Sequence, residues 1–148
     1  MRRIVLESPF AGTSHLPHWM PRIAHWFAGK CAERRNVRYA RACLRDALIR
    51  GDAPLASHLL YTQPGLFKDR VPSERQWGIA AGLAWCRTAS ATVVYVDRGI
   101  TEGMRDGIAA AERAGIPIEY RSLTTASALT PSTAETPTHA SAENTPST

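Results

Sequence analysis

The sequence lacks the marks of several protein classes. No apolar run approaches the roughly 20 residues that a membrane-spanning helix needs. Its three cysteines stand at unrelated spacings and form no CxxC pair, which excludes a secreted scaffold built on disulfides. The apolar stretch after Arg2 and Arg3 stops at Glu7 and is too short for a signal peptide. We therefore expect a cytoplasmic domain that does not associate with membranes.

Lysine and aromatic residues are also scarce. Only Lys30 and Lys68 among the 18 basic residues are lysine, and aromatic residues make up 7% of the chain. The net charge is +5: residues 1–50 have ten basic and three acidic side chains, whereas residues 51–148 have eight and ten. No basic helix with interleaved aromatics stands out, so nucleic acid is not the expected main ligand. A basic adaptor that binds nucleic acid or a protein partner through the Arg-rich first helix stays open as a third reading.

The last part of the chain has a composition unlike the rest. Of the 27 residues from Ser122 to Thr148, 21 are Ser, Thr, Ala or Pro. Such a segment has too little apolar surface to offset the entropy of ordering. We predict a disordered tail at 122–148 and one folded domain at 1–121, which is long enough for a single core.

Strand and helix patterns alternate within this domain. The clearest strand is Thr92–Val96, whose continuous apolarity is typical of a strand buried on both faces. The predicted order is a strand at 4–6, a helix at 34–50, a strand at 54–58, a helix behind Pro72, the strand at 92–96, a helix capped by Thr101, and a strand at 116–120. This order predicts an α/β fold with a parallel sheet covered on both faces.

Parallel sheets of this kind bind ligands outside the carboxyl ends of their strands. The first loop there contains Glu7, a candidate catalytic carboxylate, and the sequence Ser-Pro-Phe-Ala-Gly after it. It could cradle a phosphate or a hydroxylated ligand, although it is no P-loop, and an ordinary turn is an equal alternative. The candidate ligand-binding residues in this loop are Ser8, Pro9, Phe10 and Gly12.

Two further loops are expected at the same edge of the sheet. In the third loop Asp97, Glu102 and Asp106 are candidate catalytic carboxylates, and a solvated helix start is the alternative. His58 and Tyr61, at the end of the second predicted strand, are candidate ligand-binding residues, although a single histidine is more often a packing or surface residue. The candidate ligand-binding residues at the helix start are Gly103, Met104 and Arg105.

Residues 13–32 interrupt the α/β pattern. The segment contains three histidines and Cys31, but their spacing fits no zinc motif, so we expect no metal and no cofactor. Trp19 and Trp26 lie among further apolar residues and favour a lid over the pocket mouth or a contact between copies of the chain. We therefore expect a homo-oligomer.

Several of these segments resemble a known enzyme superfamily. Ile4-Val5-Leu6-Glu7-Ser8-Pro9-Phe10, with residues 92–97 and 103–107, is similar to the nucleoside 2-deoxyribosyltransferase superfamily, which includes deoxynucleotide N-glycosidases. The resemblance spans roughly residues 3–120 apart from 13–32, and it implies a flavodoxin-like three-layer sandwich with about four to five parallel strands. More narrowly, Glu-Ser-Pro-Phe-Ala-Gly, Glu-Arg-Arg-Asn-Val-Arg-Tyr-Ala-Arg and Ala-Ser-His-Leu-Leu-Tyr-Thr-Gln-Pro-Gly look like a branch of actinobacterial and phage proteins.

The resemblance implies a nucleoside or nucleotide ligand and a carboxylate that attacks the anomeric carbon to release the base. Matching the superfamily's apolar-Glu-x-Gly motif onto Met104–Gly107 places Arg105 at the glutamate, and Gly82 falls where a second carboxylate is expected. Two readings therefore stay open. One is an N-glycosidase or deoxyribosyltransferase that uses another carboxylate. The other is a non-catalytic nucleotide-sensing module in which Arg105 clamps an anion.

Overall fold

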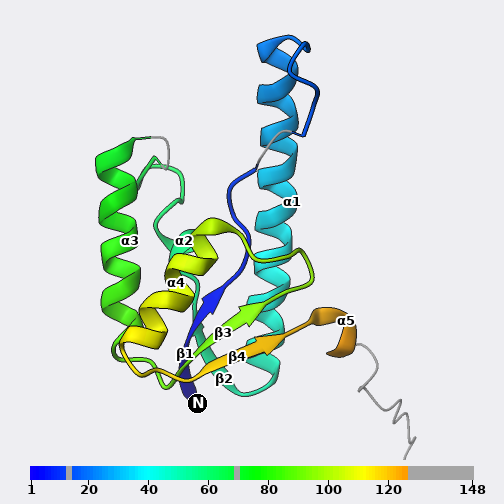
Figure 1. The fold of residues 1–148 in the computed structure, drawn as a ribbon. Coiled ribbons are helices and arrows are strands. Elements are labelled where there is room, and N and C mark those ends of the chain that lie inside the picture. The colour runs from blue at the N-terminus through cyan, green and yellow to red at the C-terminus, as the bar shows by residue number, and fades with distance from the viewer. Residues whose placement is uncertain (13–14, 69–70, 127–148) are drawn as a thin grey trace, which may run out of the picture.

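The computed structural model describes residues 1–12, 15–68 and 71–126. The elements are β1 (Arg2–Glu7), α1 (Arg22–Ile49), β2 (Asp52–Leu55), α2 (Ser57–Leu60), α3 (Pro72–Cys86), β3 (Ala91–Tyr95), α4 (Glu102–Arg113), β4 (Ile118–Arg121) and α5 (Leu123–Ala126). The four strands form one parallel sheet in the order β2-β1-β3-β4. The chain is thus an α/β sandwich of the flavodoxin-like kind (Figure 1).

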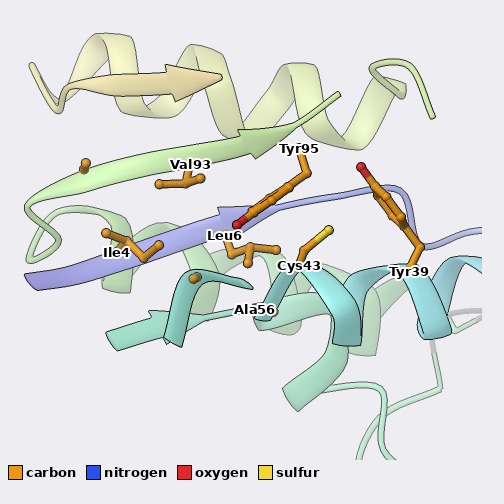
Figure 2. Packing of buried hydrophobic residues seen from close by; sticks show 9 residues of the cluster. Ile4, Leu6, Tyr39, Cys43, Ala56, Val93 and Tyr95 are labelled. Carbon is orange, nitrogen blue, oxygen red and sulfur yellow. The ribbon is translucent and has the colours of Figure 1, made fainter. Parts of the chain in front are cut away.

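The two faces of the sheet are covered by different helices. On one face Ile4 and Leu6 of β1 and Tyr95 of β3 pack against Tyr39 and Cys43 of α1 (Figure 2). On the other face Val5 packs with Cys86 of α3 and Ala111 of α4. Successive strand residues point to opposite faces, so this division also decides which side each polar residue after a strand will reach.

Helix α1 begins well before its predicted start. It runs without a break from Arg22, just after Pro21, whereas its apolar face predicted a start near residue 34. Only its second half packs on the sheet, because its buried residues begin at Tyr39, and Figure 1 shows its first turns extending beyond the sheet. Residues 22–32 of the segment expected to be a lid or interface insertion thus form the first turns of this helix.

The second strand, predicted at 54–58, begins and ends earlier than expected, at Asp52–Leu55. It ends at Leu55, and Ser57 already begins α2, so His58 lies in a helix rather than at a strand end. Pro54 is tolerated in β2 because β2 is an edge strand, where a missing N–H leaves no neighbour without a partner.

The predicted tail begins with an ordered segment. Residues 122–126 follow β4 directly and include α5, and Leu123 packs against the core on the α1 side. The prediction of disorder was therefore wrong for these five residues, and its remainder, 127–148, lies outside the described residues. Among the described residues, no helix combines the length and the apolarity needed to cross a membrane.

Candidate functional site

A pocket of about 380 Å³ lies on the α3–α4 side of the sheet, at the carboxyl end of β1. Its walls come from β1 and the loop after it, from α2, α3 and α4, and from the loop between α2 and α3. Small-molecule sites commonly have volumes of about 300–1,000 Å³. Eight of the residues predicted from the sequence line it, namely Glu7, Ser8, Phe10, His58, Tyr61, Gly103, Met104 and Asp106.

Glu7 is the carboxyl group deepest in this site. It is the last residue of β1 and shares the sheet face of Val5, so its side chain points toward α4 rather than toward α1. Burial raises the pKa of Glu7 to about 8, since water no longer stabilises the charged form. At neutral pH this side chain is a neutral carboxylic acid that can donate a proton.

Ser8 and His58 form a neutral pair beside Glu7. The Ser8 hydroxyl and Nε2 of His58 lie 3.0 Å apart, within hydrogen-bond distance, and Ser8 is buried. Burial lowers the pKa of His58 to about 4, so the imidazole is uncharged at neutral pH. The ring of Phe10 meets the imidazole edge-on, with the centroids 5.9 Å apart. The pair is suited to hydrogen bonding with hydroxyl groups of a ligand.

A second carboxyl group reaches the pocket from α4. Asp106 is exposed and lies in the second turn of the helix, whose start is capped by the Thr101 hydroxyl accepting a hydrogen bond from the Met104 N–H. Glu7 and Asp106 thus meet the same pocket in unlike surroundings, one shielded from water and one open to it. Acid and base roles commonly separate in this way.

An aromatic wall completes the pocket on the α2–α3 side. Trp85 Nε1–H donates a hydrogen bond of 3.0 Å to the Tyr61 hydroxyl, and the Tyr61 and Phe67 rings lie 6.4 Å apart. Trp77 lies beside Phe67, with ring centroids 6.0 Å apart and planes tilted by 52°, but Trp77 and Trp85 do not line the pocket themselves. Flat aromatic faces of this kind can stack on a planar ring in a ligand.

The sequence reasoning missed several lining residues. Glu74, Arg75 and Arg113 bring charge to the pocket, and Phe67 brings an aromatic ring. The helix behind Pro72 was predicted, but its sequence could not show that its apolar residues Ile79, Leu83 and Cys86 line a pocket. The resemblance placed a second carboxylate at position 82, but the packing here requires glycine. A Cβ on Gly82 would lie 2.9 Å from Ser57 Oγ, so glycine allows α2 to approach α3.

Asp97 lies on the other side of the sheet, and its predicted place in the site is wrong. Asp97 stands two residues after Tyr95, so it lies on the same face of the sheet as Val93 and Tyr95, which pack against α1. Its carboxylate accepts hydrogen bonds from the Tyr39 hydroxyl (2.6 Å), the Ser122 hydroxyl (2.5 Å) and three groups of Leu123 and Thr124. Partial burial opposes ionisation, but these bonds hold the pKa of Asp97 well below its usual range.

Four other predicted residues do not line the pocket. Glu102 and Arg105 are exposed on α4, and their side chains leave the helix in directions about 100° from their lining neighbours. Pro9 is buried. Gly12 packs against α1, where a Cβ would lie 2.0 Å from the carbonyl oxygen of Gly29. Gly12 therefore serves a backbone contact and not a ligand.

The aromatic residues before and within the first turns of α1 are also outside the pocket. Trp19, Trp26 and Phe27 are exposed, and no residue of 15–32 lines the cavity, so this segment does not cover the pocket in the structure. Within the described ranges, no three His, Cys, Asp or Glu side chains gather closely enough to hold a metal ion.

Comparison with known proteins identifies the family of the chain. The chain belongs to the family described as "Domain of unknown function (DUF7768)", whose match covers residues 2–121. This range ends with β4 and contains all the lining residues of the pocket. Neither a search of curated proteins nor a search of solved structures returned a match.

Proposed function

We propose that the pocket binds a nucleoside or nucleotide and cleaves or transfers its N-glycosidic bond, as the resemblance to the nucleoside 2-deoxyribosyltransferase superfamily implies. One observation carries the proposal. Two carboxyl groups in unlike surroundings, Glu7 and Asp106, line one pocket of suitable volume. The glycosidases that retain configuration use such a pair, one group as acid and the other as nucleophile.

The proposed reaction proceeds in two steps. The carboxylate of Asp106 attacks the anomeric carbon while the bond to the base breaks, and the proton of Glu7 passes to the leaving base. Water, or a second base, then attacks the glycosyl-enzyme and regenerates Asp106, and the proton lost by the attacking group returns to Glu7. Ser8 and His58 would bind the sugar hydroxyls, and the wall of Tyr61 and the neighbouring Phe67 would stack on the base.

Incubation with nucleosides, their mono-, di- and triphosphates and NAD tests the proposal, with free base measured by liquid chromatography and binding by thermal shift. A ligand at about 100 times its Kd adds about 2.7 kcal/mol of stability. Asp106→Asn and Glu7→Gln are expected to abolish base release. Glu102→Gln is the matched control, since it removes a carboxylate of the same helix that does not line the pocket.

The outcomes separate the possible roles of the pocket. Stabilisation with release of base supports the proposal. Stabilisation with intact ligand replaces it with a non-catalytic nucleotide-sensing module. If no nucleoside or nucleotide stabilises the protein, both are excluded, and the Arg-rich α1 becomes the surface to test for nucleic-acid or partner binding by the salt dependence of affinity.

The proposal extends to assembly and location. The exposed side chains of Trp19, Ile23, Trp26 and Phe27 offer an apolar surface for a second copy of the chain, so we propose a homo-oligomer. Sedimentation of a Trp26→Ser/Phe27→Ser variant, expected to be monomeric, tests this. The three cysteines are free, which fits a reducing compartment, and the proposed location is the cytoplasm.

A further inference from the structure

The carboxyl group of Glu7 lies against a residue of α4 that has no side chain. An ideal Cβ built on Gly107 would lie 2.4 Å from Oε1 and 2.7 Å from Cδ of Glu7. Atoms in a packed interior do not approach so closely, so the carboxyl of Glu7 occupies the volume that a side chain at position 107 would fill. Both residues line the pocket, so this volume is part of the pocket wall.

A second glycine on the same helix shows that this contact is particular to Gly107. Gly103 lies one turn earlier and also lines the pocket, yet a Cβ built on it would meet nothing within 4 Å. Glycine is among the least favourable residues inside a helix. The space it leaves for Glu7 therefore gives a reason for glycine at position 107, whereas no such contact exists at position 103.

We propose that Gly107 is a positioning residue for the acidic group of the pocket: its missing side chain seats the carboxyl of Glu7 between β1 and α4, where it is partly shielded from water. The pocket then requires a carboxyl group at this position, whether β1 or another element carries it. An aspartate at position 107, with a small residue at position 7, would deliver a carboxyl group to the same volume from the helix. The catalytic role of that carboxyl rests on the proposed function, whereas its seating does not.

The seating is tested by titrating Glu7 in protein labelled with ¹³C at the glutamate carboxyl carbons, with Glu7→Gln identifying its signal. In Gly107→Ala the added methyl group displaces the carboxyl toward water, and we expect its proton affinity to fall about tenfold or more, a shift of at least about one pH unit. The matched control, Gly103→Ala, leaves the titration unchanged. An unchanged titration in Gly107→Ala overturns the proposal.

A second measurement decides the case if Gly107→Ala folds poorly. In the Glu7→Ala background the volume is empty, so Gly107→Ala is expected to raise the thermal midpoint through its better helix propensity. At about pH 5, where the Glu7 carboxyl is protonated, the gain is expected to be smaller with Glu7 present, because the carboxyl must then move. An equal change in both backgrounds would show that the contact does not involve Glu7.

Transfer of the carboxyl to α4 gives the final test. Glu7→Ala/Gly107→Asp is expected to regain a carboxyl that titrates well above the usual range, observed with ¹³C-labelled aspartate, and to regain base release lost in Glu7→Ala. An ordinary titration in this variant contradicts the proposal. If the wild-type protein releases no base, the proposed function fails, but the titrations still decide whether Gly107 seats Glu7.

Discussion

Glu7 and Asp97 are acidic residues at the carboxyl ends of adjacent strands, yet the fold treats them in opposite ways. Glu7 ends β1 and turns toward α4, where burial raises its pKa to about 8. Asp97 follows β3 and turns toward α1 and α5, where five hydrogen bonds hold its pKa low. The first arrangement leaves a carboxyl group with a raised pKa in a pocket, whereas the second ties the chain after β4 to the sheet. Position at a strand end therefore does not by itself mark a functional carboxylate.

The largest effect expected from this difference is the pH dependence of stability caused by Glu7. Folded protein keeps a proton that unfolded chain releases above about pH 4.5, so the stability due to the protonated form is lost as the pH rises from 4.5 to 8. The loss is on the order of 4 kcal/mol. Glu7→Gln removes it, and urea unfolding at about pH 5 and about pH 9 measures the change. A variant that loses stability in parallel with the wild type would contradict the assignment.

His58 is expected to produce the opposite slope. Its pKa is lowered from 6.5 to about 4, so the unfolded chain takes up a proton that the folded protein does not, and stability is lost as the pH falls from 6.5 to 4. The loss is about 3 kcal/mol. His58→Asn removes this loss, and NMR titration of the imidazole measures the pKa directly. A folded-state pKa near 6.5 would show that the ring is hydrated.

Asp97→Ala is expected to cost about 2 kcal/mol at neutral pH, because hydrogen bonds to a charged acceptor contribute more than neutral ones. Hydrogen exchange of the Leu123 and Thr124 amides should quicken, since both donate to Asp97. Asp106→Ala is the matched control and should change stability by less than about 0.5 kcal/mol. Equal losses in the two variants would mean that Asp97 does not anchor this segment.

The smallest effect is expected for Tyr39→Phe, which removes the hydroxyl that donates to Asp97 but keeps the ring beneath Arg98. Loss of one such bond costs about 1 kcal/mol. Tyr120→Phe is the control with no expected change in stability, because the Tyr120 ring, in β4, is exposed. Urea unfolding at neutral pH measures the stability lost in each variant. Equal losses would show that the hydrogen bond from Tyr39 to Asp97 makes no net contribution to stability.

The contrast between Glu7 and Asp97 also shows how far the sequence could predict the site. The apolar run of β3 predicts a strand buried on both faces, but continuous apolarity does not tell which face meets which helix. The direction of Asp97 therefore could not be read from the residues before it. Part of the loop after β1, Ser8, Phe10 and Ala11, does line the pocket, as expected for a loop at the carboxyl end of a strand in a parallel sheet.

Errors in helix boundaries have a similar origin. The apolar face from Val37 to Leu48 predicted only the half of α1 that packs on the sheet, since periodicity reports burial and not helicity. The first half, from Arg22, also has apolar residues at helical spacing, Ile23, Trp26 and Phe27, but they are exposed, and the sequence led us to expect a lid or a contact surface there. Residues 122–126 were assigned to a disordered tail on composition, whereas the carboxylate of Asp97 orders them through hydrogen bonds between residues far apart in sequence.

The sequence by itself determined the local features: the two central strands, the Thr101 cap of α4, and the parallel direction of the strands. These follow from the conformational preferences and periodicity of neighbouring residues. Only the tertiary structure decided that Glu7 is buried against Gly107 while Asp97 is hydrogen-bonded. The proton affinity of a side chain depends on what packs around it, and those neighbours come from distant parts of the chain.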